Sequence, residues 1–303
     1  MTRTVWLASY PKSGNTWFRM LVANLSSTDD GPADINDLSE RGGIASAREP
    51  FDYLLLIDSG LLTHDEIDCL RPRVYEALAG GAEDDECDEP ESDRTVRFVK
   101  VHDAYTLTSN GEPLLAGARG AAGAIVIIRD PRDVALSLAH HMGSTADDAI
   151  AFMSAVHAGF GAKENVQQGQ LRQKLLGWSG HVASWLDQRD VPVHLVRYED
   201  MQADAADTLR RALAFAERPA ADEQIQRAVA FADFAELRRQ EQAHGFREAP
   251  AARPSEFFRR GEDGAWRDEL TVAQVERIEA AHAPMMQRLG YRLSRVPSLA
   301  CAG

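Results

Sequence analysis

The sequence is poor in cysteine, and the few cysteines are far apart. Only three occur among 303 residues, namely Cys69, Cys87 and Cys301. Disulfide frameworks and zinc sites need cysteines in even sets or at short ligand spacings. We therefore expect neither of these, and the three side chains are typical of incidental thiols in a reducing compartment.

Long apolar runs and an excess of positive charge are also lacking. No stretch approaches the roughly twenty apolar residues of a membrane span, and the short apolar run after Arg3 does not have the form of a secretory signal. With 33 basic and 47 acidic side chains the formal net charge is −14, whereas nucleic-acid-binding proteins present a basic face. These absences predict a soluble, cytoplasmic protein without nucleic-acid or membrane partners. An anionic small molecule can still bind, because local donors decide that.

Internal repeats and linkers rich in Gly, Ser or Pro are absent as well, which predicts a single domain over residues 1–303. Strand-like apolar runs occur at residues 5–9, 95–101, 124–128 and 193–198. Helical patterns lie between them, among them His64 to Ala79. This alternation predicts an α/β fold with a central parallel sheet flanked by helices. The acidic run 83–93, within residues 80–94, predicts a solvated, mobile loop.

The stretch Tyr10–Trp17 has the composition of an anion-binding turn. It follows an apolar strand, contains Lys12 and Gly14, and opens an amphipathic helix. The N–H groups at a helix start have no intrahelical partner, and the helix dipole adds positive charge there. Gly14 permits close approach of the backbone, and Lys12 adds a full charge. The lysine precedes the glycine here, unlike in the common nucleotide-triphosphate loop. An ordinary turn with a solvated lysine is the alternative interpretation.

Two further segments carry positive charge in positions suited to a phosphate. Arg129 follows an apolar strand, and Asp130 and Pro131 are a natural N-cap and first residue of the next helix. Arg129 is thus predicted at the carboxyl end of a parallel strand, where α/β sheets bind ligands. Near the C-terminus, Arg259–Gly261 combines two cations with a glycine, as a flexible phosphate clamp requires. The alternatives are an Arg129–Asp133 ion pair and an exposed basic turn.

The spelling of these three segments resembles that of the sulfotransferases, which transfer a sulfuryl group from 3′-phosphoadenosine-5′-phosphosulfate (PAPS). The resemblance implies that the first, P-loop-like segment binds the 5′-phosphosulfate and that the other two bind the 3′-phosphate. Arg129 and Ser137 match the family's spacing of an arginine and a serine, and Arg260 replaces a lysine. Aromatic residues would complete an adenine slot. The PAPS-binding residues implied in this way are Lys12, Ser13, Gly14, Asn15, Thr16, Trp17, Arg129, Ser137, Tyr198, Phe234, Arg259, Arg260 and Gly261.

Lys100-Val101-His102, at a predicted strand end, resembles a lysine–x–histidine of the same family. The period of two in a strand places Lys100 and His102 on the same side. The resemblance implies that His102 is the general base for the acceptor hydroxyl, and histidine titrates near neutral pH. Lys12 would stabilise the leaving phosphate and Lys100 the sulfuryl group, so no metal ion is expected. Other candidates for the base are His140, His141 and Asp103.

The resemblance extends over nearly the whole chain. It predicts a PAPS-dependent sulfotransferase that forms a sulfate ester on a small molecule or secondary metabolite. A nucleotide-dependent kinase with a variant phosphate loop and a non-catalytic nucleotide-binding protein are the alternatives. The sequence does not identify the acceptor, whose pocket we expect residues 26–65, 83–93 and 142–175 to shape.

A short segment near the C-terminus concerns subunit contact. Arg267, Thr271, Val272 and Glu276 resemble a dimer motif of cytosolic family members, with arginine in place of lysine. The resemblance implies a homodimer. The alternative is simply a helix start capped near Thr271.

Overall fold

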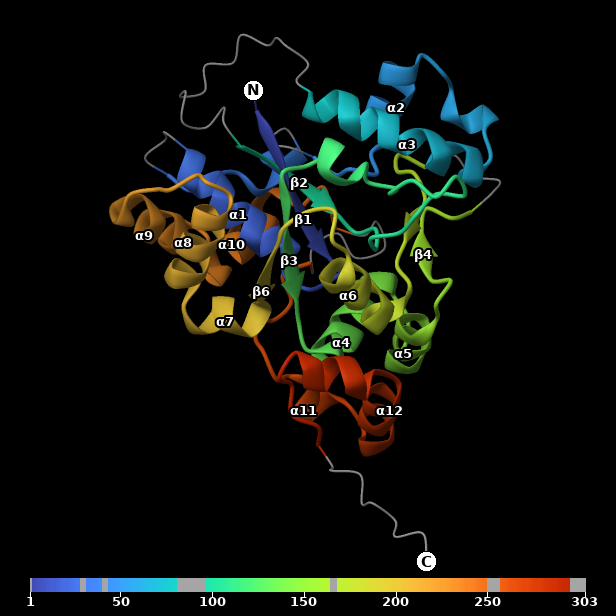
Figure 1. Ribbon diagram of the computed structural model, residues 1–303. Helices are drawn as coiled ribbons and strands as arrows, with labels where there is room; N and C mark the ends of the chain where they lie inside the picture. Colours follow the sequence, from blue (N-terminus) through green and yellow to red (C-terminus); the bar gives the residue numbers. More distant parts are fainter. Residues whose placement is uncertain are drawn as a thin grey trace, which may run out of the picture.

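A parallel β-sheet forms the centre of the computed structural model, which describes residues 2–27, 31–39, 43–80, 96–163, 168–249 and 257–294. Within these residues the strand order is β2–β1–β3–β6 (Figure 1). The strands are β1 (Arg3–Ser9), β2 (Val96–Val101), β3 (Gly123–Ile128) and β6 (Val193–Arg197). β3 is buried along its whole length, as expected of a strand covered on both faces. The predicted central parallel sheet is confirmed.

Helices cover both faces of this sheet, and each face has its own apolar core. In β1, Val5 and Leu7 belong to one core and Trp6 and Ala8 to the other, because successive side chains of a strand point to opposite faces. The Leu7 side packs against α1 (Asn15–Ser26), α8 (Ala205–Phe215), α9 (Asp222–Phe231) and α10 (Phe234–His244). The Trp6 side packs against α3 (His64–Ala79), α4 (Pro131–Met142), α5 (Ala146–Ser154), α6 (Gly177–Asp187) and α12 (Val272–Arg288).

Shorter elements connect these layers. The helical ones are η1 (Ile35–Ser39), α2 (Arg48–Leu55), η2 (Ser59–Leu61), η3 (Gly117–Arg119), α7 (Tyr198–Ala203) and α11 (Trp266–Glu269). β4 (Gly159–Phe160) and β5 (Gln173–Lys174) pair antiparallel, apart from the central sheet.

Helix boundaries follow the local signals of the sequence. α3 spans the predicted residues and begins with a capping box of Thr63 and Glu66. α4 begins at Pro131, and the Asp130 side chain caps its first turn as predicted. α12 begins at Val272 after a cap by Thr271. The predicted acidic loop, residues 83–93, lies outside the described residues.

The strand register gathers the predicted functional residues at one edge of the sheet. Ser9 lies opposite Ile127 of β3, and Ile128 lies opposite Arg197 of β6. The loop after β1, the residues after β2 and β3, and the start of α7 therefore emerge side by side. Tyr198 was predicted as the last residue of its strand but is the first residue of α7, because the pairing of β6 with β3 ends one residue earlier, at Arg197 opposite Ile128.

Candidate active site

The turn between β1 and α1 is built for close backbone approach. Gly14 precedes α1 with φ 100°, and a Cβ there would lie 2.5 Å from Cδ2 of Tyr198. Lys12 also has a positive φ of 70°, which is uncommon for a residue with a side chain. The Asn15 amide nitrogen donates to the carbonyl of Leu7 at 2.8 Å and thereby ties the helix start to the strand. The N–H groups at the start of α1 are thus held at the sheet edge, where an anion can accept from them.

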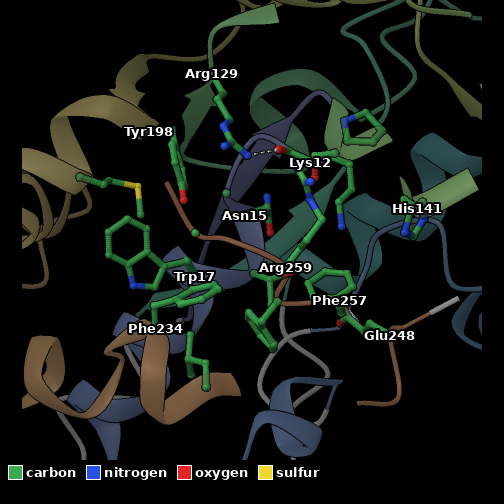
Figure 2. A pocket seen from close by; sticks show the side chains of 18 of the residues that line it. Lys12, Asn15, Trp17, Arg129, His141, Tyr198, Phe234, Glu248, Phe257 and Arg259 are labelled. Atoms are coloured by element: carbon green, nitrogen blue, oxygen red, sulfur yellow. Dashed lines mark hydrogen bonds between the residues drawn. The ribbon is translucent and has the colours of Figure 1, made fainter. Parts of the chain in front are cut away.

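A cavity of about 830 Å³ opens beside this turn (Figure 2). It collects residues from every segment that the sequence analysis assigned to the donor or to the general base His102. The predicted site residues that line it are Lys12, Gly14, Asn15, Thr16, Trp17, Lys100, His102, Arg129, Ser137, Tyr198, Phe234, Arg259, Arg260 and Gly261. Ser13 is the exception: its side chain is fully buried, and its Oγ has no hydrogen-bond partner within the described residues. Ser13 can therefore contribute to the cavity only through its backbone in this conformation.

Arg129 follows β3, lines the cavity and lies over the ring of Tyr198. Its guanidinium carbon lies 4.2 Å from the ring centroid of Tyr198, and its Nη2 donates to the carbonyl of Glu262 at 2.7 Å. The alternative interpretation paired Arg129 with Asp133. Asp133 instead accepts the N–H groups of Gly264 and Trp266 at 2.6 and 3.0 Å. Arg129 consequently keeps its charge available to the cavity.

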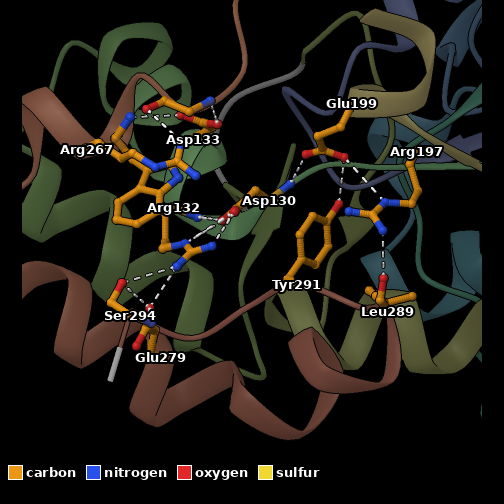
Figure 3. Close-up of polar contacts among 12 residues, drawn as sticks. Asp130, Arg132, Asp133, Arg197, Glu199, Arg267, Glu279, Leu289, Tyr291 and Ser294 are labelled. Carbon is orange, nitrogen blue, oxygen red and sulfur yellow. Dashed lines mark hydrogen bonds and ion pairs between the residues drawn. The ribbon is translucent and has the colours of Figure 1, made fainter. Parts of the chain in front are cut away.

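A polar network behind the sheet edge fixes the positions of Arg129 and Tyr198 (Figure 3). The backbone N–H of Asp130 donates to Glu199 at 2.8 Å, and the Tyr291 hydroxyl donates to the other Glu199 oxygen at 3.0 Å. Arg132 links the Asp130 carboxylate to α12 through Glu279 at 2.8 Å. The residues before α4 and α7 are thus joined to the C-terminal part of the chain.

The predicted clamp lines the same cavity as the start of α1. Arg259 and Arg260 both form ion pairs with Glu269, at 2.9 and 2.8 Å. Gly261 has φ 65°, and a Cβ there would collide with the ring of Phe234. Both arginine side chains are at least one third exposed, so solvent screening weakens these pairs. The arginines can exchange Glu269 for another anion at small cost.

Three aromatic side chains from separate elements surround one part of the cavity. Trp17 of α1 meets Tyr198 of α7 edge to face, with ring centroids 5.7 Å apart. Its indole Nε1 donates to the carbonyl of Ala232 at 3.0 Å, which fixes the ring. Phe234, the first residue of α10, lines the same cavity (Figure 2). A flat ring system can pack among such side chains.

His102 lies just after β2, with its tautomer set by the end of β1. Its Nδ1 is 2.9 Å from the carbonyl oxygen of Ser9. A carbonyl only accepts, so Nδ1 carries the hydrogen and Nε2 keeps a lone pair. Burial, together with the charge of Lys100, holds the pKa of His102 well below its usual range. The ring is therefore neutral at physiological pH and can accept a proton at Nε2.

The competing base candidates differ in position. Asp103 is buried and pairs with Arg71 at 2.6 Å, and it is not among the cavity-lining residues. His141 does line the cavity, and burial, with the charges of Lys12 and Lys100, lowers its pKa to about 4. The structure thus leaves His102 and His141 as the histidines with access to the cavity.

The two cavity lysines sit in unusual surroundings. Nζ of Lys12 lies 3.7 Å from the ring centroid of Phe257. Burial, followed by the charges of Lys100 and Arg129, lowers the pKa of Lys12 to about 7. Lys100 forms an ion pair with Glu248 at 2.8 Å, and burial lowers its pKa as well. Anions that enter this space would meet cations whose charge depends on their neighbours.

Sequence reasoning missed Glu248 and Phe257 as cavity residues. Glu248 belongs to no motif, and Phe257 lies two residues before the predicted clamp at Arg259–Gly261. Glu248 contacts Lys100 and Phe257 contacts Lys12, and the two residues of each pair are far apart in the chain. Within the described residues, no group of three or more His, Cys, Asp or Glu side chains could hold a metal ion, and no helix is long and apolar enough to cross a membrane.

Comparison with known proteins identifies the family of the chain. The chain belongs to the sulfotransferase family, whose domain matches residues 2–290. It is 26% identical to mouse (Mus musculus) sulfotransferase 2B1 over 175 residues, which make up 54% of this chain and 48% of that protein. It is also 26% identical to luciferin sulfotransferase from Photinus pyralis over 219 residues, 70% of this chain and 50% of that protein. The chain spans about half the length of these curated relatives.

Solved structures share the fold. Mouse sulfotransferase SULT7A1 complexed with PAP matches with a TM-score of 0.53 and 17% identity, over 94% of this chain and 84% of that one. Retinol dehydratase in complex with androsterone and the inactive cofactor PAP matches with a TM-score of 0.57 and 20% identity, over 97% of this chain and 82% of that one. At these identities the likeness concerns the fold alone.

Proposed function

We propose that this protein transfers the sulfuryl group of PAPS to a hydroxyl group of a small-molecule acceptor. The observation that carries the proposal is one cavity with two groups of anion-binding residues, an aromatic slot and a neutral histidine. A donor with a phosphosulfate, a second phosphate and an adenine uses all of these features. The solved relatives in complex with PAP, 3′-phosphoadenosine-5′-phosphate, support the same donor.

The donor is assigned to the cavity by charge and shape. Lys12 and the N–H groups at the start of α1 bind the phosphosulfate. Arg129, Ser137 and the Arg259–Gly261 clamp bind the 3′-phosphate, for which the arginines give up their pairs with Glu269. The adenine packs in the slot formed by Trp17, Tyr198 and Phe234.

In the reaction, His102 takes the proton of the acceptor hydroxyl at Nε2. The hydroxyl oxygen then bonds to sulfur, while the bond between sulfur and the bridging oxygen of the 5′-phosphate breaks. Lys12 and Lys100 stabilise the charge that moves onto the leaving phosphate. The products are a sulfate ester and PAP, and the proton remains on His102 until solvent removes it.

The acceptor is assigned to the part of the cavity near His102. This part of the cavity is lined by residues from the segments that we expected to shape the acceptor pocket. Their side chains are apolar, aromatic or amide: Ile44, Phe160, Gln170 and Gln173. His141 and Phe257 add two further rings. This wall suits a small molecule with a hydroxyl next to an apolar or aromatic body.

A homodimer in the cytoplasm remains part of the proposal. In the dimer-like motif, the Arg267 guanidinium lies over the ring of Trp266, 4.7 Å from its centroid, within the same chain. Size-exclusion chromatography with light scattering would give twice the chain mass for a dimer. Wild type that elutes at 33 kDa across micromolar concentrations would leave only the helix-cap interpretation of this segment.

The test of function is transfer from radiolabelled PAPS to a panel of phenols, alcohols, amines and sugars. We compare wild type with Lys12→Ala, His102→Ala and His141→Ala, and use the exposed His244→Ala as the matched control. We expect His102→Ala to lower kcat about 100-fold or more, as for the loss of a general base, and His244→Ala to leave it unchanged. If wild type neither binds PAP nor labels any acceptor, the proposed function is wrong. If only His141→Ala loses turnover, the base is His141.

A further inference from the structure

Glu248 joins three elements on the wall of the cavity. Its Oε2 pairs with Nζ of Lys100 from β2 at 2.8 Å, and its Oε1 pairs with Nη1 of Arg19 from α1 at 2.7 Å. Glu248 itself follows α10 and is labelled beside Phe257 in Figure 2. Each oxygen of the carboxylate thus pairs with a different cation, and the two cations belong to different parts of the fold.

Both cations need this partner because they are buried. The side chains of Lys100 and Arg19 are only 12% and 7% exposed, and an unpaired buried charge is costly. Arg19 also donates to the carbonyl of Leu38 at 2.9 Å. Burial lowers the pKa of Lys100, repulsion from Arg19 lowers it further, and Glu248 opposes both.

Glu248 cannot itself act as the base. Burial raises its pKa, but Lys100 and Arg19 outweigh this effect and hold the pKa at about 2. The carboxylate therefore stays charged over the whole physiological range. Its negative charge also reaches Lys12 and His102, without a direct contact to either.

We propose that Glu248 is a positioning residue that keeps Lys100 charged and fixed on the cavity wall, ready for the anionic end of the donor. The donor assignment rests on the proposed function, whereas the hold of Glu248 on Lys100 does not. The charged groups with the largest effect on the pKa of Lys100 are Glu248 and Arg19, and Lys12, His102 and His141 also face it. Lys100 in turn lowers the pKa values of Lys12 and His102.

A purely structural tether is the competing explanation, and opposite charge effects distinguish the two. Glu248→Gln removes the anion, so the pKa of Lys100 should fall, by about 1 to 3 units for loss of a charge in contact. Arg19→Gln removes a competing cation, so the pKa of Lys100 should rise. A tether lost in either variant would not move the pKa of Lys100 in opposite directions.

The measurement is direct because the chain contains only four lysines: Lys12, Lys100, Lys163 and Lys174. In protein labelled with ¹³C-lysine, NMR titration of the ε-carbons follows each one, and Lys→Arg variants assign the signals. The matched control is Glu217→Gln, a carboxylate that pairs with Arg3 and is 71% exposed. It should leave the Lys100 titration unchanged.

Kinetics give a second readout. kcat/KM for PAPS reports the ionisation of the free enzyme. The kcat/KM of wild type divided by that of Glu248→Gln should therefore grow by about tenfold between pH 6 and pH 9. Glu248→Asp keeps the carboxylate and should restore most of the wild-type profile. If Arg19→Gln and Glu248→Gln move the pKa of Lys100 in the same direction, or Glu248→Gln leaves it in place, the proposal is wrong.

The two proposals fail separately. Wild type that binds no PAP, but shows the opposite shifts of Lys100, would refute the proposed donor and uphold the charge control by Glu248. Normal sulfuryl transfer with a pH-independent loss in Glu248→Gln would uphold the function and refute this role. Should Glu248→Gln fail to fold, a fall in the pKa of Lys100 in Arg19→Gln is sufficient to refute it.

Discussion

Binding of PAP is expected to take up a proton at Lys12. Burial, followed by repulsion from Lys100 and Arg129, lowers the pKa of Lys12 to about 7. An anion bound in contact favours the charged amine and returns the pKa toward its usual value of about 10. In the free protein Lys12 is then about half protonated at pH 7 and about one tenth protonated at pH 8. Binding takes up about 0.9 proton at pH 8 and about 0.1 at pH 6.

The sign of the pH dependence follows from this difference. The complex holds more protons than the free protein, so the affinity falls as the pH rises above 7, by about tenfold per unit until the pKa of the complex is reached. Isothermal titration calorimetry at pH 8, in two buffers with different enthalpies of protonation, measures the proton uptake. This range also avoids the second ionisation of the phosphates at about pH 6.

Two variants turn this into a sharp test. Lys12→Arg keeps a permanent charge, so it should bind PAP with little proton uptake and a flatter pH profile. Lys163→Arg changes an exposed lysine and should behave as wild type. The reasoning is refuted if wild type takes up no proton at pH 8, or if Lys12→Arg takes up as much as wild type.

Three further predictions concern the frame around the cavity. Arg129→Ala should weaken PAP binding about 10- to 100-fold, which corresponds to the loss of a charged hydrogen bond. The affinity for AMP, which has no 3′-phosphate, should stay unchanged when it is measured by competition. Equal losses for both ligands would contradict the 3′-phosphate assignment. Asp103→Asn removes the nearer of the two carboxylates that pair with the fully buried Arg71 and leaves only Asp68, at 3.5 Å. Urea unfolding should therefore show a loss of about 3 kcal/mol, the low end for a broken buried pair, and a loss below about 1 kcal/mol would be inconsistent with this view. Gly14→Ala places a methyl group against the Tyr198 ring at a positive φ and should abolish PAP binding at concentrations that saturate wild type, with the fold checked by circular dichroism.

Much of the fold was predictable because its signals are local. α3 begins and ends where the apolar period and the Thr63 cap indicate. The start of α4 follows from Asp130 and Pro131 alone. The buried run of β3 required a parallel strand with cover on both faces. The end of β6 was misjudged by one residue, since it depends on where the neighbouring strand stops.

The candidate site was predictable to the extent that it lies at strand ends. Parallel strands deliver their carboxyl ends to one edge, so the Lys12 loop, His102 and Arg129 had to converge once the sheet was correct. Their roles stay predictions. The assignment of Ser13 to PAPS binding also stays a prediction, and the burial of its side chain limits that role to its backbone in this conformation.

By itself, the sequence determined the α/β sheet, the glycine turn before α1 and the family of the chain, because each depends on patterns of residues that are neighbours in the chain. Only the tertiary structure decided which charges meet. Glu248 lies 148 positions from Lys100 in the chain and still contacts it at 2.8 Å. Likewise, Asp103 is committed to Arg71, although it directly follows His102. Charge state depends on burial and on partners a few ångströms away, and long-range packing supplies both.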